Sequence, residues 1–181
     1  IRTMGTLHQA NWFAAMLAED AHLSADIWCW RGLCPGQTPY STVRSDIQRW
    51  FPGYETLTFG TVLSWEQTSG SQRWSGRVSG TDTKPLTFAQ IRPMQNTFTF
   101  GDALFQFGQP TRVQIHGYIG YQTWLIFVYY DHGIYTEMVM DEPRLRPTQA
   151  VLSISFDTTG QTTIPPDFYP RRNTINGWHG F

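Results

Sequence analysis

Apolar residues recur at helical spacing in three stretches of the chain. Residues 7–22 place large apolar side chains three or four positions apart among alanines, which favour a helix. Residues 38–51 begin with Thr38 and Pro39, a pair typical of a helix start with threonine as the N-cap, and end before Pro52–Gly53. Residues 99–108 form the shortest stretch, which Gly108-Gln109-Pro110 ends.

The other segments show imperfect alternation of apolar and polar residues and are rich in Thr, Val, Phe, Trp and Tyr, as strands are. Short turns of Gly, Ser and Asp separate them, so each strand is expected to pair antiparallel with the next. We expect an irregular segment at 24–36. The expected strands are 56–67, 72–79, 85–92, 112–118, 121–130, 134–140 and 150–157.

This order of elements predicts an α+β fold of two tandem units, each a helix with an antiparallel meander, the helices packed on one face of the sheet. One such unit has too little core to stand alone, whereas two can share one. The expected parts are an N-terminal helix (1–26), a first helix and three-strand repeat (27–95), a second repeat (96–158), and an extended C-terminal tail (159–181) that packs on the body.

Composition limits the classes of partner. The 181 residues carry a net charge of −1, with 15% charged residues and Lys84 as the sole lysine. Nucleic acids and anionic membrane surfaces both require a basic surface, so neither is expected as a partner. The longest strongly apolar run, 124–130, is too short to cross a bilayer, so membrane attachment is expected only through an anchor outside this chain.

Two cysteines, Cys29 and Cys34, lie five positions apart in the segment CWRGLC. In an oxidising compartment they could close a small disulfide loop, with Gly32 relieving strain. Alternatively, they are reduced thiols packed as small apolar groups, or zinc ligands together with His8 and His22, although the paired short spacings of zinc motifs are missing.

No set of residues completes a catalytic constellation. Ser79 lies in GRVSG rather than in a nucleophile elbow, and His22 could act only with a free thiol. His132 could be a base oriented by Asp131, but Asp131-His132-Gly133 is more simply a hairpin turn. Asp131 and Asp141 could form a carboxylate pair for sugar hydrolysis. We therefore expect a non-enzymatic protein with no cofactor and no metal.

Aromatic side chains are the remaining candidates for function, because an exposed aromatic on a sheet makes a good anchor for a partner. The alternative is that they fill the core between helices and sheet, but Tyr118 or Tyr121, near a turn, is expected to be exposed. The expected binding residues are Trp65, Trp74, Tyr118, Tyr121 and Trp124.

Two segments resemble the BamE/SmpA family of bacterial envelope lipoproteins, to which β-lactamase inhibitor protein-like domains are similar. They are P-G-x-T-x4-V at 35–43 and T-x4-L-x2-F-G-x-P-x2-V at 99–113, although Trp50-Phe51-Pro52-Gly53 departs from the pattern in the first half. The segment C-W-x-G-L-x-P-G-x-T at 29–38 also resembles a recurrent motif of bacterial exported lipoproteins with this repeat. The resemblance implies an extracytoplasmic, non-enzymatic module of the cell envelope that binds another protein, a membrane complex among the candidates, through an aromatic-rich sheet face. A small-ligand binding protein for a lipid or a sugar is the alternative.

Overall fold

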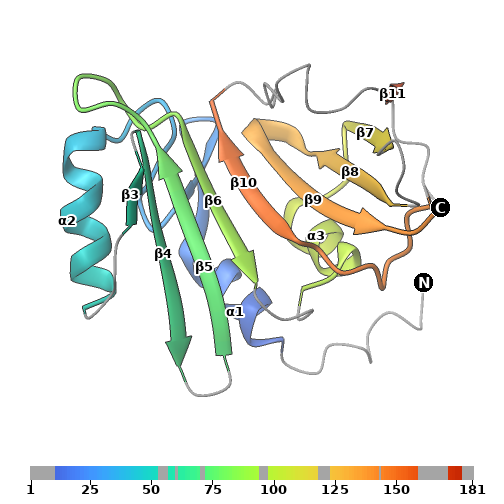
Figure 1. Cartoon of the computed structure of the whole chain (residues 1–181), viewed down its shortest axis with the longest axis horizontal. Helices are drawn as coiled ribbons and strands as arrows, with labels where there is room; N and C mark the ends of the chain where they lie inside the picture. The colour runs from blue at the N-terminus through green and yellow to red at the C-terminus, as the bar shows by residue number, and fades with distance from the viewer. Residues whose placement is uncertain are drawn as a thin grey trace.

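The computed structural model describes residues 11–52, 57–59, 61–69, 72–93, 98–117, 123–142, 144–158 and 171–176. Within these ranges the protein is α+β, with three helices, a two-stranded ribbon and a nine-stranded antiparallel sheet (Figure 1). No helix in these ranges is long and apolar enough to span a bilayer.

The first helix is shorter than expected. Helix α1 spans Trp12–Asp20, and the Asn11 side chain caps it by accepting hydrogen bonds from the Phe13 and Ala14 amides. The expectation of a helix to residue 22 was wrong because β1 (Ala21–Ser24) pairs with β2 (Ile27–Trp30). Ala25 and Asp26 join these strands with φ of 47° and 63°, the left-handed geometry of a two-residue hairpin turn. The segment expected to be irregular therefore includes β2, and residues 7–10 lie outside the described part.

The other two helices lie where the pattern places them. Helix α2 spans Tyr40–Trp50, with Val43 and Ile47 buried. Its N-cap position is Pro39 and not Thr38, because the Thr38 hydroxyl bonds to the preceding loop instead. Helix α3 spans Phe100–Phe107 and begins with a capping box, in which Thr99 and Asp102 each bind the other's backbone amide.

The strands form two meanders that meet at the centre of the sheet. The first contains β3 (Leu57–Phe59), β4 (Val62–Ser69), β5 (Gln72–Ser79) and β6 (Phe88–Pro93), so the strand expected at 56–67 is a hairpin. The second contains β7 (Arg112–Gly117), β8 (Trp124–Tyr129), β9 (Ile134–Met140) and β10 (Ser153–Asp157). The turn η2 (Asp131–Gly133) joins β8 to β9.

The order of strands across the sheet is β11-β7-β8-β9-β10-β6-β5-β4-β3. Strands β6 and β10 are therefore hydrogen-bonded neighbours and lie side by side in the middle of the molecule (Figure 1). The edge strand β11 (Arg171–Asn176) comes from the segment expected as an extended tail and pairs with β7. The rest of that tail lies outside the described residues.

Strand residues alternate between two faces of the sheet. One face, here called the core face, contributes to a single apolar cluster with Phe13 and Leu17 of α1, Val43 and Ile47 of α2, and buried residues of α3. Its strand members include Trp65, Trp74, Ile91, Ile126, Ile154 and Phe156. The opposite face carries a smaller buried cluster of Leu125, Phe127, Tyr129 and Tyr135, and polar side chains across β4, β5 and β6.

Candidate functional site

Two of the expected aromatic anchors are buried. Trp65 is 2% exposed and Trp74 is 4% exposed, and both project from the core face of β4 and β5. Their rings pack with Trp30 and Phe51: Trp30 stacks on Trp65 at 5.9 Å between ring centroids, and Trp74 meets Phe51 edge-on at 5.2 Å. Contrary to the expectation of exposed anchors, both tryptophans are buried in the core with Trp30 and Phe51.

Of the other three aromatic candidates, the structure describes Trp124 alone. Trp124 is partly buried and packs against the main apolar cluster. Tyr118 and Tyr121 lie outside the described residues. The large apolar residues that the described ranges do expose, Leu23, Phe105 and Val139, lie on three separate elements.

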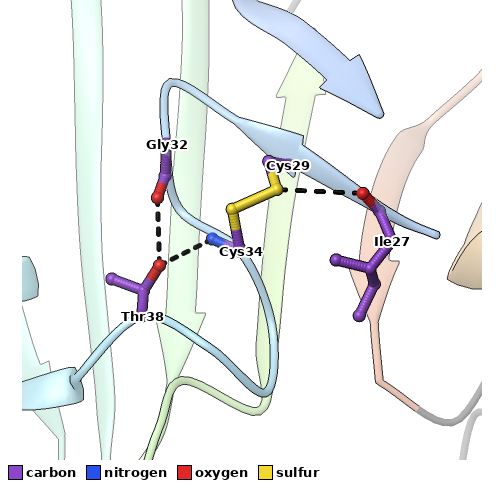
Figure 2. The surroundings of a disulfide bond; sticks show 5 residues. All are labelled: Ile27, Cys29, Gly32, Cys34 and Thr38. Carbon is purple, nitrogen blue, oxygen red and sulfur yellow. Dashed lines mark hydrogen bonds between the residues drawn. A yellow bond between two sulfur atoms is a disulfide. The ribbon is translucent and has the colours of Figure 1, made fainter. Parts of the chain in front are cut away.

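The cysteines form a disulfide that closes the loop between β2 and α2. The Cα atoms of Cys29 and Cys34 are 4.4 Å apart, and no cysteine is free. Thr38 ties the same loop together, since its hydroxyl accepts the Cys34 amide at 2.8 Å and donates to the Gly32 carbonyl at 3.0 Å (Figure 2). The bond excludes reduced thiols, a thiol nucleophile and cysteine ligation of zinc. A disulfide of this kind is typical of proteins outside the cytosol.

The acid–base candidates do not assemble into a catalytic site. His132 is exposed in the η2 turn with φ of 62°, and its Nδ1 lies 3.2 Å from the Asp26 carbonyl oxygen, which supports a turn role. Asp131 and Asp141 flank the seven residues of β9, so roughly 20 Å of strand separates them, too far for a glycosidase pair. Nor do the described residues contain a group of three His, Cys, Asp or Glu side chains placed to hold a metal.

Polar side chains gather instead on the opposite face of β4, β5 and β6. They surround an open depression of about 500 Å³. Its lining residues are Ser64, Trp65, Glu66, Ser75, Gly76, Arg77, Gln90 and Arg92. Polar and apolar residues alternate along these strands. Because Leu63, Val78 and Ile91 lie on the core face, the polar residues next to them lie on the opposite face.

Strand register aligns these side chains in two rows. Ser64 lies opposite Arg77, and Arg77 lies opposite Gln90. In the next row Glu66 lies opposite Ser75, and Ser75 lies opposite Arg92. Because residues directly opposite each other on paired strands share a face with Cβ atoms about 5 Å apart, each row is a continuous line of polar groups.

Gln90 is the buried centre of the surface, with 3% of its area exposed. Its Nε2 donates to Ser153 Oγ and Ser155 Oγ, both at 3.0 Å, and Ser153 Oγ donates to Glu137 Oε2 at 2.9 Å. Tyr135 lies opposite Ser155 on β9. Burial raises the pKa of its phenol above the ordinary value, and the hydrogen bond with Ser155 partly opposes this increase. The phenol therefore stays protonated. The network holds the Gln90 amide in one orientation.

Two arginines, Arg77 and Arg92, and two glutamates, Glu66 and Glu137, lie around Gln90. Arg77 and Arg92 make no ion pair with any described residue, whereas Glu66 is engaged by Arg73 at 3.2 Å. The Arg77 guanidinium lies 5.4 Å from the centroid of the Phe88 ring, a cation–π contact that orients it while leaving its N–H donors available. The surface therefore offers guanidinium donors beside a buried amide.

Apart from Trp65, sequence reasoning did not select the residues that line the depression, since none belongs to a binding motif. The signal that could have identified them is the set of polar residues that alternate with apolar ones in three adjacent expected strands. Once the register is known, Ser64, Arg77 and Gln90 lie in one line. The register depends on the turns between the strands, which the sequence pattern locates only to within a residue or two.

Comparisons with known proteins give one distant likeness. No protein-family model matches the sequence, and no curated protein matches it. The crystal structure of a DUF4309 family protein (YjgB) from Bacillus subtilis aligns with a TM-score of 0.46 and 11% sequence identity, over 82% of this chain and 97% of that one. Similarity this low assigns the chain to no family.

Proposed function

We propose that this chain is a non-enzymatic protein-interaction module of the bacterial cell envelope, outside the cytoplasm, that docks a partner protein on the polar face of β4, β5 and β6. The observation that carries the proposal is the depression in which Arg77 and Arg92 border the buried amide of Gln90. Arginine is enriched where proteins meet, because its planar group binds carboxylates and carbonyls through several donors at once.

In this proposal the chain consists of two tandem units, α2 with β3–β6 and α3 with β7–β10, whose helices cover the same face of the sheet. Residues of α1, α2 and α3 share one apolar cluster with the core-face residues of both meanders, which supports this arrangement. The last strands of the two meanders, β6 and β10, pair with each other at the centre of the sheet. The opposite face of β4–β6 is then left for a partner.

Rigid positioning suits binding at this surface. Its polar groups project from hydrogen-bonded strands, and the amide that they surround is held by Ser153 and Ser155. Side chains fixed in this way lose little freedom when a partner docks. The disulfide between Cys29 and Cys34 supports a location in an oxidising compartment.

Site-specific photocrosslinking in the producing cells tests the proposal. A photoreactive amino acid at Ser75, in the depression, is expected to give one discrete adduct, which Arg77→Glu with Arg92→Glu abolishes. The same amino acid at Gln48, exposed on α2, is the matched control and should give none. The partner identified from the adduct should then bind the purified protein in calorimetry. An identical adduct pattern at both positions would contradict the proposal.

A second candidate is a small-ligand binding protein. The volume of about 500 Å³ lies within the range of small-molecule sites, and the lining of serines, glutamine and arginines suits the hydroxyl groups of a sugar better than a lipid chain. Calorimetric titration with neutral and acidic sugars discriminates the two functions. Saturable sugar binding that Arg77→Gln weakens would favour this second candidate over protein docking.

A further inference from the structure

We infer that the depression on β4–β6 recognises an extended acidic segment, with carboxylates on Arg77 and Arg92 and a backbone N–H donated to the Gln90 side-chain oxygen. This inference rests on the proposed docking function and adds the chemistry of the partner. Three features of the described structure carry it: the direction of the hydrogen bonds around Gln90, the spacing of the two arginines, and the distribution of charge.

The hydrogen-bond direction follows from Glu137. A carboxylate has no proton to donate, so the Ser153 hydroxyl donates to Glu137 and its oxygen must accept from Gln90. The second N–H of the Gln90 amide is used by Ser155. The polar atom left on this side chain is therefore Oε1, an acceptor, and Gln90 lines the depression. A ligand must bring a donor to meet it.

The arginines stand on two sides of that acceptor. Arg77 lies directly opposite Gln90 on β5 and leans toward the Phe88 ring, whereas Arg92 lies two residues further along β6 on the other side of Gln90. Arg77 and Arg92 are diagonal neighbours on paired strands, whose Cα atoms lie roughly 7–8 Å apart. An extended peptide with acidic residues at alternate positions repeats at the same distance and offers a backbone N–H between them.

The charge distribution selects against other segments. The whole chain has a net charge of −1, yet the two arginines in the depression have no acidic partner among the described residues, and Glu66 is already paired with Arg73. A basic segment would be repelled. A polyanion without N–H groups would satisfy the arginines but leave Gln90 Oε1 unpaired, so polyphosphate should bind more weakly than an acidic peptide.

Fluorescence anisotropy with labelled peptides tests the inference on the purified, oxidised protein. The probe is an eight-residue peptide of alternating glutamate and threonine, and the control replaces each glutamate with glutamine. The glutamate peptide should bind and weaken as salt rises, and the control should not bind. Arg77→Gln and Arg92→Gln should each lower the affinity about tenfold. Arg144→Gln removes an equal charge from an exposed site elsewhere and should have no effect.

A second arm tests the role of Gln90. Glu137→Gln supplies an amide that can donate to Ser153, so the Ser153 hydroxyl can donate to Gln90 once the Gln90 amide flips and turns Oε1 toward it. An analogue of the probe with ester bonds in place of its central amides lacks the backbone donors. The wild type should prefer the amide peptide severalfold, and the Glu137→Gln variant should lose that preference while keeping its dependence on Arg77.

The outcomes separate the two proposals. No binding of the glutamate peptide, unchanged affinity in both arginine variants, or tighter binding of polyphosphate would each overturn the acidic-segment inference. A partner crosslinked at Ser75 that binds equally well to Arg77→Gln and Arg92→Gln at all salt concentrations would leave the docking surface standing and remove only its proposed chemistry.

Discussion

Gly76 on β5 lies directly opposite Trp65 on β4, and the Trp65 indole occupies the space that a side chain at position 76 would need. A glycine inside a strand usually weakens it, because it adds backbone freedom to the unfolded chain and has no side chain to pack. Here it lets a tryptophan ring lie flat across the neighbouring strand and stack with Trp30. One small residue thus permits the aromatic core beneath the proposed docking surface.

Replacing Gly76 with alanine should destabilise the protein by about 1–3 kcal/mol, because the new methyl group forces the Trp65 ring out of its packed position. Urea denaturation followed by tryptophan fluorescence measures the change. Ser75→Ala, on the same strand but on the opposite face, is the control and should change the free energy of unfolding little. In the double variant Trp65→Leu with Gly76→Ala, the alanine should cost less; an equal cost in both backgrounds would contradict the clash.

The elements most visible in the sequence are those whose local signals agree with the fold. Helix α2 combines an apolar face, Pro39 at its start and Pro52 after its end, and the helix formed as expected. The prediction of helix at residues 21 and 22 was wrong, because the Ala25–Asp26 turn holds them in a hairpin although the alanines before them favour a helix. That turn has neither glycine nor asparagine to indicate left-handed backbone, so the tertiary fold overrides local propensity.

The candidate site was less accessible to sequence reasoning. Alternation correctly indicates that Leu63 and Trp65 share a face, but it cannot tell which face the helices cover. Aromatic residues were expected outside because they make strong anchors, and the core used Trp65 and Trp74 instead. The joining of β6 to β10, which brings Ser153 and Ser155 to Gln90, spans more than 60 residues and leaves no local pattern.

Removal of the disulfide should weaken the fold without abolishing it. Replacing Cys29 and Cys34 together with alanine should lower the free energy of unfolding by about 2 kcal/mol, since the crosslink closes a short loop. Urea denaturation measures the loss, and the intact mass of the wild type should rise by two hydrogens on reduction. Thr38→Val removes the second tie of the same loop and should cost less than the double cysteine change. Equal masses before and after reduction would refute the bond.

The N-terminus of α3 depends on a reciprocal cap. Thr99→Ala should cost about 1 kcal/mol, because it leaves the Asp102 amide without its hydrogen-bond acceptor. Thermal unfolding followed by circular dichroism measures the effect, and Thr99→Ser, which keeps the hydroxyl, should recover most of it. If serine and alanine proved equally destabilising, the methyl group and not the cap would be the stabilising feature.

Stability should fall in alkaline solution because of two buried tyrosines. Burial raises the pKa values of Tyr130 and Tyr135 above the ordinary value of 10.0. In the unfolded chain both phenols lose their protons near pH 10, whereas in the folded protein they keep them, so the stabilisation present below pH 10 is lost as the pH rises further. Both cysteines are in the disulfide and Lys84 is the sole lysine, so tyrosines, eight in the chain, are the main groups that titrate in this range.

The expected slope above pH 10 is about 1.4 kcal/mol per pH unit for each buried tyrosine. Urea denaturation at intervals between pH 8 and pH 11.5 measures it. Tyr130→Phe and Tyr135→Phe should each remove the contribution of one phenol to this slope, whatever their effect on the free energy of unfolding at pH 8. A pH dependence that survives unchanged in both variants would show that these phenols ionise alike in the folded and unfolded chain.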